Sequence, residues 1–375
     1  MDRPRTARRV NAAERLQRLA DADVESWSDM PARLLHVLAP GHGIDVEVAA
    51  GVEDLRTRAP VQPGSRFRIA SVTKPFVATA ALRLVEDGTL SLDATIDQLL
   101  ARPYDDLLGR GGYDTGAITL RHLLTHTSGI YDFAADAYSG DIDDGFTALV
   151  HKDPSRRWSR YEQIEFAVEH GRPYGPPGDV FGYSDTGACL VGEIVERTTG
   201  TSMGAAIREL VGFGRLGIST TWQETIEPEP PRLPPLSHQY VGEMDVADMD
   251  ASVDLYGGGG LMSTCRDLAR FFHALLRGGV FRSSATLETM TTTLGGVPRA
   301  PLTSEEAVDD AAMFLFRSEI GGETWWGHDG YWGTSAYSCP ALDVTIVAGH
   351  QRSDMPKGFD RMAIFARALE VVRGA

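Results

Sequence analysis

Lysine is scarce in this 375-residue chain. Of its 36 basic residues, Lys74, Lys152 and Lys357 are lysines and the rest are arginines. A guanidinium group does not lose its proton in a protein, so arginine can supply positive charge but cannot serve as an amine that exchanges a proton. Chemistry that needs such an amine must use a lysine, and Lys74 becomes the first candidate.

Cysteine is also rare, and no cysteine belongs to a paired motif. Cys189, Cys265 and Cys339 are odd in number, lie far apart and form no C-x-x-C pair. This pattern argues against a disulfide framework and against a zinc site. Each cysteine stands among apolar or small residues, so we expect three buried side chains that act as small hydrophobes.

Net positive charge and long apolar runs are lacking as well. The formal net charge of -16 repels nucleic acid and anionic lipid headgroups, so neither nucleic acid nor a membrane is expected as a partner. No run approaches the roughly 18 apolar residues of a membrane span. The basic N-terminal residues lead into an amphipathic helical pattern and not into the apolar core of a signal peptide, which predicts a cytoplasmic protein.

Apolar periodicity gives a first outline of the fold. Leucine, alanine and valine recur at helical spacing over about residues 11–37, and GIDVEVAAGV at 43–52 alternates like a strand. RFRIA at 66–70 then runs into a helical pattern that Gly88 ends. Residues 91–250 are predicted to form mostly helices and irregular loops.

The C-terminal part predicts an antiparallel sheet. Four short segments rich in β-branched and aromatic residues are typical of hairpin strands: AMFLFRSEI, ETWWGH, GTSAYSC and DVTIVAGHQ. The last amphipathic segment, FDRMAIFARALEVVR, would pack its apolar side on that sheet. We therefore predict an α/β fold, with an antiparallel sheet flanked by helices in a domain of residues 1–90 and 251–375. A mostly helical domain, 91–250, would be inserted into it, with the active site in the cleft between the two.

The first candidate for chemistry is Ser71-Val72-Thr73-Lys74, where a predicted strand leads into a helix. Residues three apart project from the same side of a helix, so the serine hydroxyl and the lysine amine can touch. A hydroxyl becomes a good nucleophile when a neighbouring base takes its proton, and a desolvated amine can assist. The alternative is an ordinary helix start, with Ser71 as N-cap and an exposed lysine.

The second candidate is Tyr183-Ser184-Asp185, directly before a helical pattern. A tyrosine hydroxyl close to an amine can serve as a general base, and Asp185 can hydrogen-bond the amine or the substrate carbonyl. A tyrosine beside a helix start can equally have a structural role.

The third candidate is His328-Asp329-Gly330, between two predicted strands. The polar residue would supply one wall of a site, and the glycine would let the backbone approach the substrate and contribute an oxyanion-hole N–H. A histidine beside an aspartate also suggests a metal site. No other ligand set has suitable spacing, so we expect neither a metal nor another cofactor.

Aromatic residues surround the third candidate, and two interpretations of them stay open. They would form an apolar wall for an acyl or aromatic substrate, or they would pack in the sheet. The residues concerned are Trp325, Trp326, Tyr331 and Trp332. For His122 and His126 we expect structural hydrogen bonds and no part in catalysis.

The order of these motifs resembles that of the serine β-lactamase and penicillin-binding-protein superfamily: S-x-x-K, then a Y-x-N-like triplet, then a K-T-G-like triplet, over about 260 residues. Longer stretches are similar to the branch that contains class C β-lactamases, D,D-carboxypeptidases, D-aminopeptidases and family VIII esterases. These stretches are LRHLLTHTSGI, PPGDVFGYSDTGACLVGEIVERTTG, GGGGLMSTCRDLARF and GHDGYWGTSA. The resemblance covers roughly residues 40–350.

The resemblance implies a role for each matching position. Ser71 would be the acylated nucleophile, Lys74 its proton partner, and Tyr183 the base that also returns a proton to the leaving group. His328 would occupy the third-motif position among the catalytic residues. The backbone N–H groups of Ser71 and Tyr331 would form the oxyanion hole, in which each donor typically contributes about 3 kcal/mol to transition-state stabilisation. The other expected substrate-binding positions are Asp185, Gly330 and Trp332.

Two departures from the family pattern bear on function. Asp185 stands where the second motif usually ends in asparagine, which adds a negative charge beside Lys74 and favours its protonated form, so Tyr183 becomes the preferred base. His328 replaces a lysine common in true β-lactamases and removes a fixed positive charge that would hold a substrate carboxylate. This second change argues against antibiotic hydrolysis and resembles the esterase and peptidase members.

The sequence thus predicts a serine hydrolase or acyltransferase that forms an acyl-enzyme on Ser71 from a small-molecule ester or amide. Water, or an amine or alcohol acceptor, would resolve the intermediate. The alternative within the same chemistry is a cytoplasmic transacylase or transesterase of a natural-product pathway. A catalytically silent ligand-binding module of the same fold is the alternative from another class, and the intact Ser71, Lys74 and Tyr183 argue against it.

Overall fold

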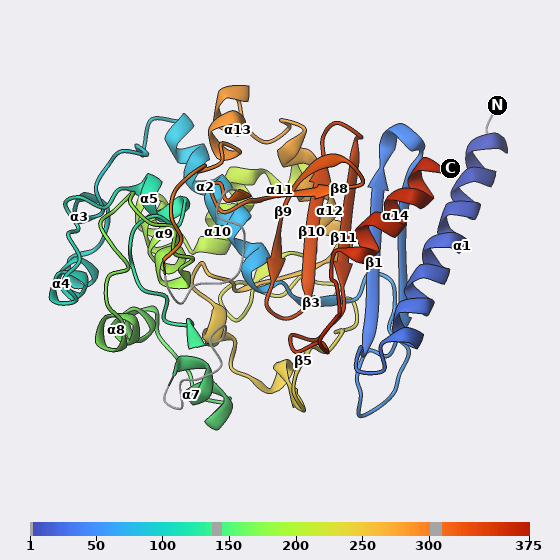
Figure 1. Ribbon diagram of the computed structural model, residues 1–375, viewed down its shortest axis with the longest axis horizontal. Helices are drawn as coiled ribbons and strands as arrows, with labels where there is room; N and C mark the ends of the chain where they lie inside the picture. Colours follow the sequence, from blue (N-terminus) through green and yellow to red (C-terminus); the bar gives the residue numbers. More distant parts are fainter. Residues whose placement is uncertain (1–2, 137–144, 301–309) are drawn as a thin grey trace.

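The computed structural model of the chain describes residues 3–136, 145–300 and 310–375, and it has two parts that lie side by side (Figure 1). One part is built on a six-stranded sheet with strand order β2, β1, β11, β10, β9, β8, in which all neighbours are antiparallel. The other part is mostly helical. The strands are β1 Ala32–Ala39, β2 Ile44–Gly51, β8 Phe316–Ile320, β9 Glu323–Gly330, β10 Thr334–Cys339 and β11 Val344–Gly349. The predicted α/β fold with an antiparallel sheet is confirmed.

Alternate side chains of the central strands enter two separate apolar clusters. Leu35 of β1 and Ile346 of β11 belong to one cluster, whereas Leu34 and Val347 belong to the other. Successive side chains of a strand point to opposite faces of the sheet, so each face carries its own apolar layer. Burial of both layers requires helices on both faces.

Helices α1 (Arg3–Ser26) and α14 (Ala363–Arg373) cover the first face and lie at the right of Figure 1. Helix α12 (Cys265–Leu276) covers the second face and contacts β1, β10 and β11. The prediction that the C-terminal helix packs its apolar side on the sheet is confirmed.

The helix predicted over residues 11–37 is wrong in its second half. Helix α1 ends at Ser26, and Ala32–Ala39 form β1, which pairs with β2 and β11. Because β1 is buried on both faces, its sequence ARLLHVLA is an almost continuous apolar run. Such a run lacks the alternation by which a half-buried strand is recognised.

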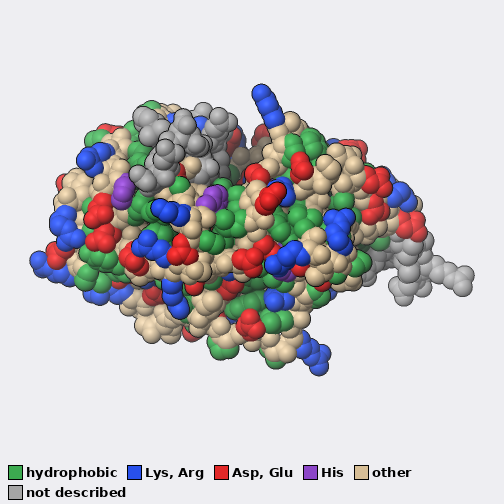
Figure 2. Space-filling view, turned by 90° about the horizontal axis from the view of Figure 1, so that it is seen from below, with side chains coloured by type: hydrophobic (Ala, Val, Ile, Leu, Met, Phe, Trp, Pro, Cys, Tyr) green, Lys and Arg blue, Asp and Glu red, His purple; other side chains and the backbone are tan. Residues whose placement is uncertain are grey.

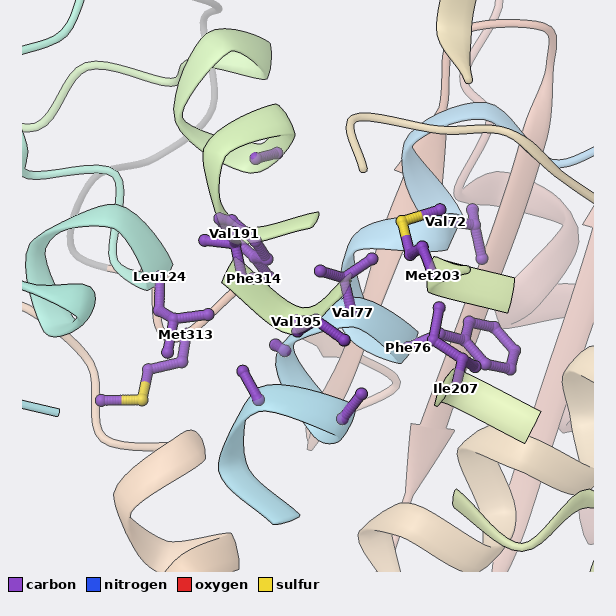
Figure 3. Close-up of a cluster of buried hydrophobic side chains, with 14 of the residues drawn as sticks. Val72, Phe76, Val77, Leu124, Val191, Val195, Met203, Ile207, Met313 and Phe314 are labelled. Carbon is purple, nitrogen blue, oxygen red and sulfur yellow. The ribbon is translucent and has the colours of Figure 1, made fainter. Parts of the chain in front are cut away.

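The helical part is organised around α2 (Lys74–Glu86). Phe76 and Val77 of α2 pack with Val195 of α9 and Ile207 of α10 (Figure 3). The Phe76 ring also stacks on Phe271 of α12, with ring centroids 3.5 Å apart, so α2 is held from both parts of the molecule. The other helices are α3 Ile96–Leu99, α4 Arg102–Arg110, α5 Leu120–Leu124, α7 Phe146–Lys152, α8 Arg160–His170, α9 Asp185–Thr199, α10 Met203–Val211, α11 Phe213–Leu216 and α13 Ser284–Met290. The domain division at residues 90 and 250 stays a prediction.

A small second sheet leads the chain into α2. It has the order β3 (Arg66–Arg68), β7 (Leu261–Thr264), β4 (Trp222–Gln223), and a separate hairpin is formed by β5 (Tyr240–Val241) and β6 (Met244–Asp245). Strand β3 pairs antiparallel with β7, so the segment after β3 is anchored to the strand that precedes α12.

Acidic and basic side chains are intermixed on the face of the molecule that Figure 2 shows, without one large acidic patch there. Among the residues that the structure describes, no helix combines the length and the apolar character needed to cross a membrane.

Candidate active site

Ser71 lies in a short 3-10 helix, Ala70–Thr73, between β3 and α2. The Ile69 N–H donates to the Leu261 carbonyl at 3.1 Å, which fixes the entry to this helix against β7. Ala70 has φ +46°, a backbone conformation that is unfavourable for a non-glycine residue and that recurs at functional sites. Ser71 belongs to the first turn, whose N–H groups have no acceptor inside the helix. The N-cap positions of this helix and of α2 are Ile69 and Thr73, so the alternative interpretation of Ser71 as N-cap is wrong.

Lys74 is fully buried and contacts Ser71. Its Nζ lies 2.8 Å from Ser71 Oγ and 2.8 Å from the Gly258 carbonyl oxygen, and it forms an ion pair with the Asp185 carboxylate. Two of its N–H donors thus have hydrogen-bond acceptors, and the Asp185 carboxylate balances its charge. The alternative of an exposed lysine is therefore wrong.

Tyr183 lies beside this amine. Lys74 Nζ is 4.8 Å from the centre of the Tyr183 ring, and the ring is buried. On its other side the ring stacks on His126, with centroids 4.5 Å apart. The next residue, Ser184, caps α9 by accepting from the Gly187 N–H at 3.0 Å, and so places Asp185 in the first turn of α9. The second motif is thus held at the buried start of a helix.

His126 holds the second motif in place by accepting a backbone hydrogen bond from it. Its Nδ1 accepts the Ser184 N–H at 3.2 Å, so Nδ1 carries no proton, and burial holds the pKa of the imidazole well below its usual range. A neutral ring can stack on Tyr183 without adding charge. The predicted structural hydrogen bond of His126 is confirmed.

His328 is a neutral imidazole near Tyr183, with ring centroids 6.2 Å apart. Burial, followed by the positive charge of Lys74, lowers the pKa of His328 to about 3. Its Nδ1–H donates to the Asp329 carbonyl at 2.6 Å, which leaves Nε2 as an acceptor without a partner among the described residues. The Asp329 side chain points to the other face of the sheet, where it accepts from Tyr337, because neighbouring strand residues alternate.

Gly330 lies directly against the segment that leads into Ser71. A Cβ at this position would be 2.5 Å from the Ile69 carbonyl oxygen, so only glycine lets the end of β9 approach the 3-10 helix so closely. This approach brings Tyr331 and Trp332, in the turn after β9, to the same pocket as Ser71.

Ser71 opens into a pocket that is walled mainly by apolar side chains. Of the other predicted site residues, Asp185, Tyr331 and Trp332 line it, whereas Lys74, Tyr183, His328 and Gly330 are not among its lining residues. Trp325 instead packs in the core beneath α14. Tyr331 and Trp332 therefore fit the interpretation as a pocket wall, whereas Trp325 fits the interpretation as sheet packing. The remaining lining residues are Phe133, Ala134, Phe146, Thr147, Val150, His151, Met249, Val253 and Asp254.

Two further carboxylates lie near Lys74, and sequence reasoning missed both. Burial raises the pKa of Asp132, whose Oδ1 accepts the Asp185 N–H at 3.1 Å. Burial and the Asp185 charge also raise the pKa of Asp254, to about 7, although its side chain borders the pocket. A Cβ on Gly258 would be 2.7 Å from the Asp185 carboxylate, so this glycine makes room for it. The glycine run 257–260 could have pointed to Asp254, because Gly259 lies against its carboxylate.

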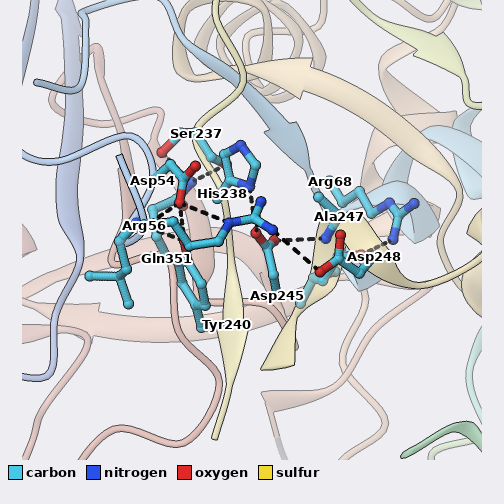
Figure 4. A network of polar contacts seen from close by, with 12 residues as sticks. Asp54, Arg56, Arg68, Ser237, His238, Tyr240, Asp245, Ala247, Asp248 and Gln351 are labelled. Atoms are coloured by element: carbon cyan, nitrogen blue, oxygen red, sulfur yellow. Dashed lines mark hydrogen bonds and ion pairs between the residues drawn. The ribbon is translucent and has the colours of Figure 1, made fainter. Parts of the chain in front are cut away.

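A separate polar group has the spacing of metal ligands. The side-chain ligand atoms of Asp54, His238 and Asp245 lie within 4.8 Å of one another. The Arg56 guanidinium lies between the two carboxylates, 3.4 Å from Asp54 and 3.1 Å from Asp245 (Figure 4). The carboxylates are thus already paired with a cation, and the group does not line the pocket of Ser71. The three cysteines are buried and unpaired, as predicted.

With this geometry in hand, the fold and the site define a class: the β-lactamase and transpeptidase-like fold. The Beta-lactamase family model matches residues 37–369, and the chain belongs to this family. Esterase EstB of Burkholderia gladioli is 34% identical over 187 residues, 48% of this chain and 44% of that protein. Penicillin-binding protein 4* of Bacillus subtilis (strain 168) is 26% identical over 264 residues, 67% and 53% of the two chains. The chain spans about half the length of these relatives.

Solved structures share the fold over the whole chain. D-amino acid amidase from Ochrobactrum anthropi SV3, complexed with L-phenylalanine amide, superposes with a TM-score of 0.76 at 23% identity and covers 97% of this chain and 99% of that one. EstCE1, described as a hydrolase with promiscuous acyltransferase activity, has a TM-score of 0.68 at 20% identity and covers 96% and 98%. The predicted family and fold class are confirmed.

Proposed function

We propose that this chain is a serine hydrolase or acyltransferase that forms an acyl-enzyme on Ser71 from a small-molecule ester or amide. The observation that carries the proposal is the 2.8 Å contact between Ser71 Oγ and the buried Lys74 amine at the edge of an apolar pocket. Membership of the Beta-lactamase family and the similarity to an esterase support it. The ordered Ser71 and Lys74 pair argues against a catalytically silent binding module.

The hydrogen bonds of Lys74 favour Tyr183 as the base. Lys74 donates to Ser71 Oγ and to the Gly258 carbonyl oxygen, and its charge is paired with the Asp185 carboxylate, so the amine acts as a donor toward Ser71. Tyr183, as phenolate, takes the hydroxyl proton while Ser71 Oγ bonds to the carbonyl carbon. The nearby ammonium offsets the phenolate charge, because Nζ is 4.8 Å from the ring.

The tetrahedral intermediate then carries its negative charge on the former carbonyl oxygen. Backbone N–H groups of Ser71 and Tyr331 would stabilise this oxyanion, and each such donor typically contributes about 3 kcal/mol. When the bond to the leaving group breaks, Tyr183 returns the proton to that group. Water or an acceptor then attacks the acyl-enzyme by the same steps in reverse, which releases Ser71.

Transfer to an amine or alcohol is the second candidate outcome, as in a transacylase or transesterase. The apolar walls of the pocket, among them Phe133, Phe146 and Met249, favour an acceptor that displaces water. A cytoplasmic role in a natural-product pathway stays a prediction of the sequence.

Labelling with a fluorophosphonate, read by intact mass, tests the proposal. One covalent adduct is expected on the wild-type chain and none on Ser71→Ala. Ser155→Ala, which removes an exposed serine hydroxyl, is the matched control and should be labelled normally. An unlabelled wild-type chain, or a labelled Ser71→Ala variant, contradicts the proposal. Adding amines or alcohols to assays with p-nitrophenyl esters separates the two outcomes, since a transferase incorporates the acceptor into the product.

A further inference from the structure

Asp254 is a carboxylate at the edge of the Ser71 pocket that the acyl-enzyme chemistry does not use. It lines this pocket together with Ser71 and Asp185. Its side chain makes no hydrogen bond or ion pair with any residue in the ranges 3–136, 145–300 and 310–375. A Cβ on Gly259 would be 2.1 Å from the carboxylate, so this glycine provides the space in which the side chain lies.

The cations nearest to Asp254 are already engaged elsewhere. Lys74 donates to Ser71 and Gly258 and pairs with Asp185. Arg68 pairs with Glu224 at 2.7 Å and donates further to two backbone carbonyls. Neither forms an ion pair with Asp254, although both positive charges act to lower the pKa of its carboxyl, so no cation among the described residues pairs with it directly.

An ionised Asp254 therefore adds a negative charge that no ion pair of the site offsets. Lys74 is already paired with Asp185, and burial raises the pKa of Asp132, which favours its neutral form. His126 and His328 add no positive charge near neutral pH, because burial lowers the pKa of both. A carboxylate in such surroundings is costly unless a cation pairs with it.

We propose that Asp254 binds a protonated amine of the substrate. The substrate class is then an ester or amide that carries an ammonium group close to the scissile carbonyl and that also has an apolar side chain. The ammonium would supply the missing positive charge, and the side chain would contact the apolar wall formed by residues such as Phe133, Val150 and Trp332. The inference rests on the proposed function, because it assigns the substrate of the Ser71 site. Asp254 is a binding residue in this scheme and takes no part in proton transfer.

A pair of substrates that differ only in the ammonium group tests this inference. We would compare kcat/KM for the p-nitrophenyl ester of phenylalanine with that for p-nitrophenyl phenylpropanoate, after subtracting the rates of Ser71→Ala. The wild-type chain should favour the cationic ester by about tenfold or more, the usual scale for a desolvated charge pair. Asp254→Asn, which keeps the shape of the side chain, should lower the ratio of the kcat/KM values for the two esters by about tenfold or more.

The matched control is Asp248→Asn, which removes the same charge at an exposed position. It should keep the wild-type preference. Equal rates for the two esters in the wild-type chain would overturn the inference even if Asp254→Asn fails to fold. An unchanged preference in a folded Asp254→Asn variant would overturn it as well.

Failure of the proposed function can be recognised separately. Binding of phenylalanine amide and of phenylpropanamide to Ser71→Ala, measured by calorimetry, needs no catalysis. Tighter binding of the cationic amide, lost on further Asp254→Asn substitution, supports the site whether or not Ser71 is acylated. Equal binding of the two amides overturns the site even if Ser71 is labelled by fluorophosphonate.

Discussion

Replacing Gly330 by alanine should displace Ser71, the proposed nucleophile, without unfolding the chain. The added Cβ would lie 2.5 Å from the Ile69 carbonyl oxygen, closer than the 3.0 Å that Cβ atoms keep, so the two backbones must separate by at least about 0.5 Å. Ile69 is two residues from Ser71, and the 3-10 helix between them transmits the shift. Catalytic groups need to be held within about 0.5 Å of their productive geometry, and a misplacement of about 1 Å can cost about 100-fold.

We therefore expect kcat/KM of Gly330→Ala on a p-nitrophenyl ester to fall by about tenfold to 100-fold. The melting temperature should drop by an amount that corresponds to about 1–3 kcal/mol of overpacking. Gly109→Ala is the matched control, because nothing lies within 4 Å of a Cβ there and its φ is not positive. A Gly330→Ala variant with wild-type activity would refute the argument that the close approach of β9 positions Ser71.

Three more outcomes follow from the site. Lys74→Arg should lower kcat by about 1000-fold, because the planar guanidinium cannot reproduce the contacts of Nζ in a fully buried position. Near-normal turnover of this variant would contradict a role for the amine. The preference for the cationic ester should grow as the pH rises from about 5.5 toward 7, where Asp254 ionises beside Asp185, Lys74, Arg68 and Glu224. It should fall again at higher pH, because the substrate amine loses its proton at about pH 8 or below; a preference that is constant between about pH 5.5 and 8 would contradict this. Because the pKa of His328 is lowered to about 3 by burial, the unfolded chain binds more protons than the folded one between about pH 3 and 6.5. The melting temperature should thus fall as the pH falls below about 6.5, and His328→Asn should reduce that slope.

Local contacts were predictable from the sequence. Ser71 and Lys74 meet because residues three apart share a side of a helix, whatever surrounds the helix. The four C-terminal strands were recognised because turn residues separate them. Strand β1 was taken for helix because its burial on both faces removes the alternation of a half-buried strand.

Contacts between distant segments were accessible only through the family resemblance. The neighbourhood of Tyr183 and Lys74, and of Tyr331 and Ser71, was expected because the motifs occur in a familiar order. No rule of spacing brings these segments together. Asp132 and Asp254 belong to no quoted catalytic motif and were missed.

The sequence by itself predicted the contact between Ser71 and Lys74 and the order of the motifs, since these depend on residue identity and on short-range helix geometry. The tertiary structure decided which charges are compensated. The sequence does not distinguish an aspartate that is solvated from one that is ion-paired, as Asp185 is with Lys74, or from one that has no ion-pair partner among the described residues, as Asp254 has none. Its chemistry depends on burial and on partners contributed by remote segments, and these exist only once the sheet and the helices have packed.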